Sequence, residues 1–356
     1  MHRYASKRTE PFPDKERQDD VRKGFQVFPS VANETFAKGM IKENPMIETN
    51  DLSKQFNDFV AVDGVNLSVG SGQILALLGQ NGAGKTTTVR MLTALLQPTR
   101  GSARVAGFDV AKNGHDVRSS VGVLTEHHGL YMRMTALEYM DFFGKVYNLA
   151  PALRKTRTND LLEYFGLAEA AKRRIGEYSK GMRQKLALAR AMMHEPSVIL
   201  LDEPTSAMDP ESARLVRDEI SRLKSTQRTI MLCSHNLTEV ELLADKIAII
   251  YRGKILIQGT LEELKRSVLG APEYSVRFAE AKNTDGLELP TGMELLEKTA
   301  TSLKVRVEAP EVSNPHLLKK LASMSVPVVA FQEETRTLEQ VYLKVMAAAK
   351  GKEYVQ

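Results

Sequence analysis

Several features that would narrow a protein's function are scarce in this sequence. Its 356 residues include one cysteine and no tryptophan. The single thiol, Cys233, excludes an internal disulfide and fits a reducing compartment. No apolar run approaches the roughly 18 residues of a membrane span, and the first residues lack the apolar segment of a signal peptide. If the protein serves a membrane, we expect it to act from the cytosolic side through a partner.

A large excess of one charge is lacking as well. Lysine and arginine number 49 against 44 aspartates and glutamates, a formal net charge of +5 that is spread along the chain. This balance gives no sign of nucleic-acid binding, so we expect no nucleic-acid partner. With 42% hydrophobic and 26% charged residues, the composition is that of a globular protein long enough for two domains.

The pattern of the chain changes twice. Residues 1–45 are charged, interrupted by prolines and without apolar periodicity, which predicts a disordered N-terminal extension. Residues 46–265 have the pattern of an α/β domain, in which the stretch from about 130 to 195 is mostly helical. Residues 266–356 alternate half-buried strands with helices, which predicts a small α+β accessory domain.

Three unbroken apolar runs lie in the middle region, at 73–79, 197–204 and 229–235. Such runs are typical of strands in a parallel sheet that is covered on both faces. A later segment, KIAIIYRGKILIQGT, is typical of a hairpin that turns at Arg252 and Gly253.

A glycine-rich segment, GQNGAGKTT, follows the first apolar run and precedes a predicted helix. It matches the pattern G-x-x-x-x-G-K-[ST]. Its glycines permit close approach to a phosphate, and the N–H groups at the helix N-terminus can bind phosphate oxygens. Lys85 would reach the β- and γ-phosphates, and Thr86 would bind Mg²⁺. The predicted phosphate-binding residues are Gly79, Gln80, Asn81, Gly82, Ala83, Gly84, Lys85, Thr86 and Thr87.

Polar residues end the other two apolar runs. Ligands of open α/β sheets bind at the carboxyl ends of the strands. Asp202 is therefore expected to reach Mg²⁺, directly or through water, and Glu203 to orient or deprotonate an attacking water. His235 could contact a γ-phosphate. For a lone histidine at a strand end, however, a partly exposed polar side chain is the more common role.

The helix predicted over EYSKGMRQKLALARAM begins with positive charge. Ser179 is at the N-cap position, and Lys180 and Arg183 lie in the first turns, where cations oppose the helix dipole. This helix start suits an anion that comes from elsewhere. Asp209, followed by Pro210, is expected to cap the next helix.

In this order and spacing, the motifs resemble those of the ATP-binding subunit of an ATP-binding cassette (ABC) transporter, over roughly residues 46–265. GQNGAGKTT is similar to the Walker A motif, VILLDE to Walker B, YSKGM to the family signature and SAMD to the D-loop. The resemblance implies a P-loop NTPase cassette with a RecA-like core, an antiparallel β subdomain and a helical subdomain. It also implies an ATPase with ATP and Mg²⁺ as cofactors and Lys85, Glu203 and His235 as catalytic residues. Phe56 would stack on adenine.

The same resemblance implies partners. The signature helix of one subunit closes on ATP bound to a second subunit, so the chain is expected to form a head-to-tail homodimer. Ser179, Lys180 and Gly181 would then contact the partner's γ-phosphate, and Asp209 of the D-loop would also belong to the nucleotide site. A separate membrane permease would complete the transporter, which implies a peripheral protein at the cytoplasmic face of the cell membrane.

Two departures from the family pattern stand out. Lys180 and Met182 replace the usual Gly and Gln of the signature. Glu126 stands where the family has the glutamine of its Q-loop, and our hypothesis is that it binds Mg²⁺. The neighbouring His127 and His128 point apart on any regular element, so we expect solvated loop residues rather than a metal site.

One branch of the family is indicated by LTEHHGLYMRMTALEYM, by SKGM and by the C-terminal region. They resemble the ATPase subunits of ABC-2 type exporters, the sodium- and daunorubicin-exporter-like group. Tyr139, Phe142 and Phe143 are candidates for the groove that receives the permease, although helix core is an equally good interpretation.

Other functions remain open at this point. A soluble ABC ATPase acting on ribosomes or nucleic acid is the main alternative, but such proteins usually carry two cassettes or a long coiled coil. A P-loop kinase would leave the signature and LLDEPTSAMD without a role. An energy-coupling transport subunit is therefore the favoured prediction.

Overall fold

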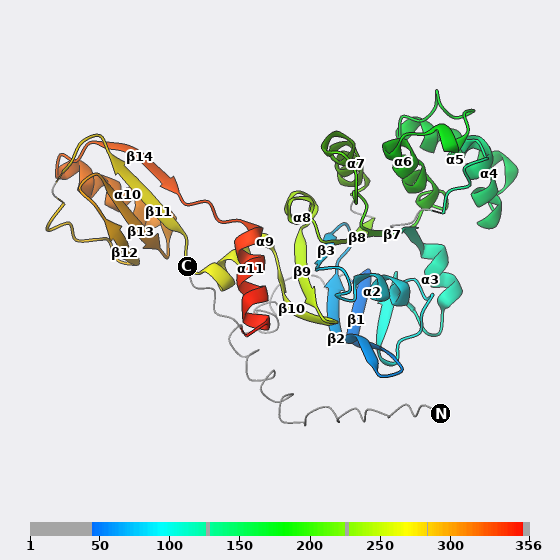
Figure 1. Ribbon diagram of the computed structural model, residues 1–356, viewed down its shortest axis with the longest axis horizontal. Coiled ribbons are helices and arrows are strands. Elements are labelled where there is room, and N and C mark those ends of the chain that lie inside the picture. Colours follow the sequence, from blue (N-terminus) through cyan, green and yellow to red (C-terminus); the bar gives the residue numbers. More distant parts are fainter. Residues whose placement is uncertain (1–44, 126–128, 225–227, 283, 352–356) are drawn as a thin grey trace, which may run out of the picture.

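The structure is a computed structural model that describes residues 45–125, 129–224, 228–282 and 284–351 (Figure 1). All but the last residue of the expected N-terminal extension lie outside the described residues. So do Glu126, His127 and His128, and with them the predicted Mg²⁺ ligand in the Q-loop.

A six-stranded sheet forms the centre of the molecule, with the strand order β10-β9-β3-β8-β7-β6. The four pairings between β9 and β6 are parallel, while β10 is antiparallel to β9. Every residue of β3, β7 and β8 is buried, which confirms the expectation of strands covered on both faces. The strands are β3 (Ile74–Leu78), β6 (Val121–Leu124), β7 (Val198–Asp202), β8 (Thr229–Ser234), β9 (Lys246–Tyr251) and β10 (Lys254–Gly259).

The hairpin between β9 and β10 turns where the sequence predicts. Tyr251 pairs with Lys254, so Arg252 and Gly253 form a two-residue loop. Both have positive φ, 46° and 80°, as a tight hairpin turn of the primed type requires.

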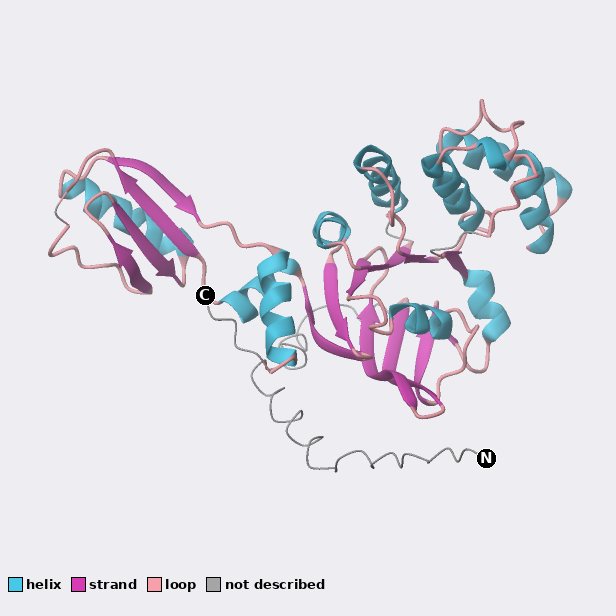
Figure 2. Ribbon diagram, in the orientation of Figure 1, coloured by secondary structure: helices cyan, strands magenta, loops and turns pink. Residues whose placement is uncertain are grey.

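An antiparallel sheet of order β2-β1-β4-β5 lies against one side of the central sheet (Figure 2). Its apolar side chains share one buried cluster with β3, with β7 and with the helix α2 (Lys85–Leu92). The strands are β1 (Ile47–Phe56), β2 (Phe59–Val69), β4 (Arg100–Val105) and β5 (Phe108–Asp109).

Helices cover the other side of the central sheet. A second buried cluster joins residues of α4, α5, α6 and α7 to β3, β7 and β8. The stretch expected to be mostly helical contains three of these helices. These helices are α4 (Ala136–Val146), α5 (Pro151–Tyr164), the short 3₁₀ helix η2 (Ile175–Glu177), α6 (Lys180–Ala191), α7 (Pro210–Leu223) and α8 (Leu237–Leu243). The helix α3 (Gly114–Ser120) lies on the side of the antiparallel sheet, where its Val117 joins the first cluster.

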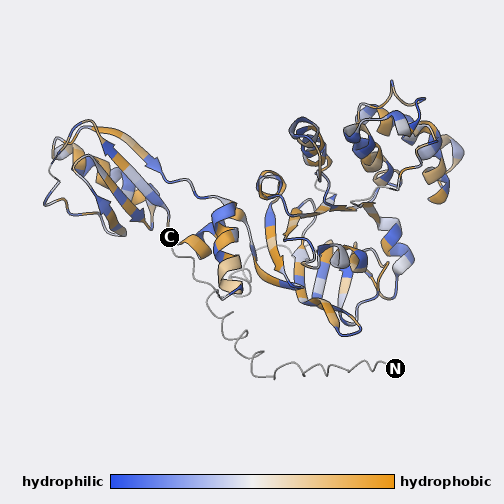
Figure 3. Ribbon diagram, viewed as in Figure 1, coloured by the Kyte–Doolittle hydropathy of each residue, from blue (hydrophilic) through white to orange (hydrophobic). Residues whose placement is uncertain are grey.

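A third sheet, of order β12-β13-β11-β14, lies at one end of the molecule (Figure 1). Its strands mix apolar and polar residues, as half-buried strands should (Figure 3), and α10 packs its leucines on the apolar face. β12 is absent from the sequence expectations. The elements are β11 (Glu273–Phe278), β12 (Met293–Lys298), β13 (Ser302–Val307), α10 (Pro310–Ser323) and β14 (Val328–Glu333).

The last helix, α11 (Leu338–Ala349), returns to the central sheet. Leu338, Val341 and Val345 share a buried cluster with β3, β9 and α9 (Leu261–Leu269). The sequence expectation assigns this helix to an accessory domain that begins at residue 266, a boundary that lies inside α9. The domain division stays a prediction, but the apolar face of α11 packs on the core of the central sheet.

Candidate nucleotide site

The glycine-rich loop joins β3 to α2 and is held in place by its surroundings. The Gly79 N–H donates to the carbonyl of Ser234 at 3.2 Å, and the Gly253 N–H donates to that of Ala83 at 2.9 Å. A Cβ at Gly79 would lie 2.5 Å from the Ile250 carbonyl oxygen, so only glycine fits there. Gly84, the N-cap of α2, has φ 109° and makes no side-chain cap. The first N–H groups of α2 are therefore available to an anion.

Lys85 is the first residue of α2, and its ammonium is buried in the loop. It donates to the carbonyls of Gly79 at 2.7 Å and Gln80 at 3.3 Å, and it forms an ion pair with Glu203 Oε1 at 3.1 Å. The side chains of the pair are only 6% and 9% exposed. The structure thus brings together two of the three predicted catalytic residues.

Glu203 directly follows β7 in an unusual conformation. Its φ is 53°, in the left-handed region that non-glycine residues rarely occupy, and its N–H donates to the carbonyl of Cys233 at 2.8 Å. Its second carboxylate oxygen lies 2.8 Å from Nδ1 of His235, whose side chain is half exposed. His235 is therefore partly exposed, as is common for a histidine at the end of a strand. In addition, it contacts the carboxylate of Glu203.

Thr86 and Asp202, the two predicted Mg²⁺ ligands within the described residues, also meet. The Thr86 hydroxyl donates to Asp202 Oδ2 at 2.8 Å, and Asp202 is the buried last residue of β7. In the described part of the chain, no group of three or more His, Cys, Asp or Glu could hold a metal.

The buried carboxylate of Glu239 lies behind the site and was not among the residues expected from the sequence. Glu239 Oε1 accepts from the Thr205 hydroxyl at 2.8 Å, and Oε2 accepts from the Ser234 hydroxyl at 2.6 Å. Burial raises the pKa of Glu239, although both hydrogen bonds act in the opposite direction. Glu239 ties the loop after β7 to the end of β8. The only sequence signal is its place three residues after Asn236, which caps α8.

The signature helix α6 begins as predicted, and its first residues contact the loop between β7 and α7. Ser179 is its N-cap and accepts from the Met182 N–H at 3.2 Å. The Lys180 ammonium donates to the carbonyls of Ser206, at 3.0 Å, and Ala207. Gln184, one turn further along α6, donates to the carbonyl of Pro204. Three carbonyls of the loop between β7 and α7 thus fix the start of α6.

Asp209 caps α7 by accepting from the Ser212 N–H at 2.9 Å, as expected. Gly181 lies beside this cap, since a Cβ there would be 3.4 Å from the Ser212 hydroxyl oxygen. Among the residues described, no hydrogen bond or ion pair joins Ser179, Lys180 or Gly181 to the glycine-rich loop of the same chain.

The remaining sequence candidates are aromatic. Phe56, at the end of β1, is 43% exposed and has the Lys54 ammonium 5.1 Å from its ring centroid. An exposed ring is available for stacking. In α4, Phe142 is exposed, but Tyr139 is fully buried and accepts from Arg190 at 3.0 Å. Tyr139 therefore belongs to the helix core.

The loop, the paired carboxylates and the parallel sheet define a nucleotide-binding protein of the P-loop class. Residues 62–206 match the family described as ABC transporter, and residues 259–346 match the ATP-binding protein DrrA1-3-like, C-terminal domain. The chain belongs to the ATP-binding subunits of ABC transporters.

Individual relatives give the same result. The ABC transporter ATP-binding protein NatA of Bacillus subtilis is 43% identical over 227 residues, which cover 62% of this chain and 92% of NatA. The daunorubicin/doxorubicin resistance ATP-binding protein DrrA of Streptomyces peucetius is 34% identical over 302 residues, 83% of this chain and 91% of DrrA. A solved structure of an ATP-binding subunit of an ABC transporter is 28% identical, has a TM-score of 0.58 and covers 63% of this chain and 94% of its own.

These findings confirm the predicted fold and favour a transport subunit over a soluble ATPase that acts on ribosomes or nucleic acid. Within the part of the chain that the structure describes, no helix is both long and apolar enough to cross a membrane.

Proposed function

We propose that this chain binds and hydrolyses ATP with Mg²⁺ as the energy-coupling subunit of an ABC exporter. It works as a head-to-tail homodimer, at the cytoplasmic face of the membrane, on a separate permease. The proposed chemistry rests on two sets of contacts. Lys85 and His235 both contact the carboxylate of Glu203, and beside them Thr86 is hydrogen-bonded to Asp202. The exporter direction rests on the similarity to the DrrA relative, whose name refers to drug resistance.

The binding step follows from the contacts of Lys85. Its ammonium is now shared between two loop carbonyls and one carboxylate. Phosphate oxygens in the loop carry more negative charge than Glu203, so we expect them to take over the ammonium. Mg²⁺ supplies further neutralisation of the β- and γ-phosphates, and Thr86 and Asp202 are the residues that would hold it.

Once Lys85 has moved to the phosphate oxygens, Glu203 can act on the attacking water. Without its cation, the carboxylate becomes a stronger acceptor for the proton of an attacking water. His235 holds the other carboxylate oxygen and is half exposed, so it can reach a γ-phosphate on the open side. Ser179, Lys180, Gly181 and Asp209 would meet the partner's nucleotide at the opposite face of the dimer.

The test uses Glu203→Gln, which keeps the size of the side chain and removes the proton acceptor. We expect ATP binding to remain, turnover to be lost and an ATP-dependent dimer to accumulate, as measured by phosphate release and by light scattering after gel filtration. Glu241→Gln, on the exposed side of α8, is the matched control and should behave like the wild type. Wild-type turnover in Glu203→Gln would contradict the catalytic assignment.

The transport role has a separate test. Tagged Glu203→Gln is expressed in the native host, membranes are solubilised gently with ATP and Mg²⁺, and the co-purifying proteins are identified. A multi-span membrane protein is expected. Ribosomes or nucleic acid without a membrane protein would contradict a transport subunit and leave the ATPase chemistry intact.

A further inference from the structure

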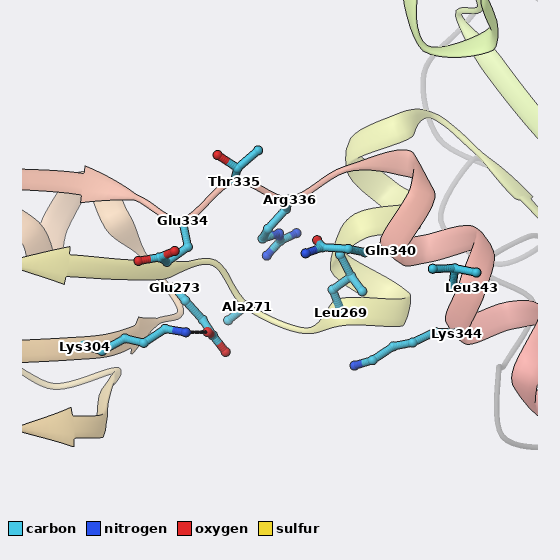
Figure 4. Close-up of a pocket in the computed structure, with 10 residues that line it drawn as sticks. All are labelled: Leu269, Ala271, Glu273, Lys304, Glu334, Thr335, Arg336, Gln340, Leu343 and Lys344. Atoms are coloured by element: carbon cyan, nitrogen blue, oxygen red, sulfur yellow. Dashed lines mark ion pairs between the residues drawn. The ribbon is translucent and has the colours of Figure 1, made fainter. Parts of the chain in front are cut away.

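A pocket of about 350 Å³ lies where the third sheet joins the rest of the molecule (Figure 4). It is bounded by α9 and α11 on one side and by β11 and β13 on the other. Both chain segments that connect these parts, at Ala271 and at Glu334–Arg336, line it. Its size is within the range of pockets for small ligands.

The charges in this pocket do not balance. Glu273 pairs with Lys304 and with Arg306, each at 2.9 Å, so this acid is neutralised. Arg336 donates one terminal nitrogen to the Gly270 carbonyl at 2.9 Å, but its buried Nε has no hydrogen-bond partner among the described residues. Lys344 extends from α11 toward the side of Glu273 and Lys304 (Figure 4). With Arg336 and Lys344 against Glu334, the lining keeps an excess of positive charge.

Three of the remaining residues that line the pocket are apolar. Leu269 and Ala271 line one side, and Leu343 lies on the same helix as Lys344. A group that satisfied the cations alone would leave this surface in contact with water. A ligand with a charged end and a short hydrocarbon body matches both parts of the wall.

We propose that this pocket binds a small amphipathic anion, with its carboxylate or phosphate group at Arg336 and Lys344 and hydrocarbon on Leu269 and Leu343. We further assign it a regulatory effect on nucleotide binding, carried by α11. This helix presents Gln340, Leu343 and Lys344 to the pocket.

The opposite side of α11 reaches the nucleotide site. Val341 shares a buried cluster with Ala76 and Leu78 of β3, the strand that leads into the glycine-rich loop. Tyr342 packs against the same cluster, and its side chain interacts with Gln80 of that loop. A ligand that shifts α11 therefore acts on Gln80 through one rigid helix, and by linkage bound nucleotide must change the affinity for that ligand by the same factor.

The first experiment titrates the full chain with octanoate, without nucleotide, by isothermal calorimetry. We expect saturable binding that falls at least roughly tenfold in Arg336→Gln/Lys344→Gln, because charge-assisted hydrogen bonds are lost. Lys319→Gln, an exposed cation of α10 outside the pocket, is the control and should bind like the wild type. No saturable binding, equal binding by octylammonium, or wild-type affinity in the double variant would overturn the site.

The second experiment measures the affinity of a fluorescent ATP analogue with and without octanoate. Tyr342→Phe should keep octanoate binding and lose the effect on the nucleotide, whereas an effect that persists in this variant would overturn the route through Gln80. The octanoate titration does not depend on ATP binding, so a failure of the proposed function is distinguishable from a failure of this site. Competition by phosphatidylglycerol vesicles would identify the natural anion as a lipid, and its absence would indicate a soluble molecule.

Discussion

Two helices of this molecule begin with a lysine, but the ammonium groups of the two lysines have different partners. Lys85 is the first residue of α2 and Lys180 is the first residue of α6. The Lys85 ammonium is buried and pairs with the carboxylate of Glu203. The Lys180 ammonium is exposed, and its partners among the described residues are backbone carbonyls of the loop between β7 and α7.

The difference indicates which anion each helix start can receive. α2 has no side-chain cap, so its N–H groups and its lysine can together receive a phosphate within one chain. α6 is capped by Ser179 and is tied to the same loop that holds Glu203. Its position therefore depends on the loop, and we predict that an anion for α6 comes from a second subunit.

The largest effect is expected when the buried pair of α2 is broken. Lys85→Ala leaves Glu203 buried without its cation, which should lower the free energy of unfolding by about 3 kcal/mol. It should also abolish binding of a fluorescent ATP analogue. Lys85→Ala/Glu203→Gln removes the stranded charge and should regain most of the stability, measured by thermal unfolding, but no nucleotide binding. Equal stability of the single and double variants would contradict the role of the pair.

The corresponding change in α6 should leave the single-chain site intact. We expect Lys180→Ala to bind the ATP analogue like the wild type, because Lys180 lies outside the glycine-rich loop. ATP turnover should fall roughly tenfold, since the start of α6 loses its link to the loop that carries Glu203. Lys185→Ala, on the same helix, is the matched control. Weakened analogue binding in dilute Lys180→Ala would show that the two helix starts are not separate in function.

Much of this comparison could be predicted from the sequence, because it depends on local patterns. The apolar runs before Gly79, Asp202 and His235 are the strands β3, β7 and β8, and the caps at Ser179 and Asp209 follow from residue type and position.

What could not be predicted depends on contacts between distant segments. Lys180 and Ala207 are 27 residues apart, and Glu239 meets Thr205 across 34 residues. β12 has two adjacent leucines between charged residues and lacks the alternation of a half-buried strand, so its pairing with β13 defines it. The packing of α11 on β3 likewise joins the end of the chain to its first third, a contact that no local pattern contains.

A smaller effect is expected at the cap of α6. Ser179→Ala removes the acceptor for the Met182 N–H and should cost about 1 kcal/mol, measured as a small fall in the thermal midpoint. Asp209→Ala makes the equivalent change at α7 and should cost a similar amount. Ser179→Gly should cost only a few tenths of a kcal/mol, since glycine is tolerated at N-caps. A larger loss in Ser179→Gly than in Ser179→Ala would exclude capping as the cause.

The smallest effect concerns Glu239, which binds Thr205 in the middle of the loop that both helix starts contact. Because burial raises the pKa of Glu239, the folded chain holds this proton more tightly than the unfolded chain. Its contribution to stability is therefore present below the ordinary glutamate range and is lost as the pH rises through the raised pKa. Glu239→Gln should remove this loss, so the thermal midpoint of Glu239→Gln should rise relative to that of the wild type between pH 5 and pH 8.

The control is Glu241→Gln, exposed on the same helix, whose thermal midpoint should change with pH as that of the wild type does. A constant difference between Glu239→Gln and the wild type over this range would mean that Glu239 does not titrate there. If the gain is observed while nucleotide binding and turnover stay equal, the loop is held by hydrogen bonds and not by the charge of Glu239.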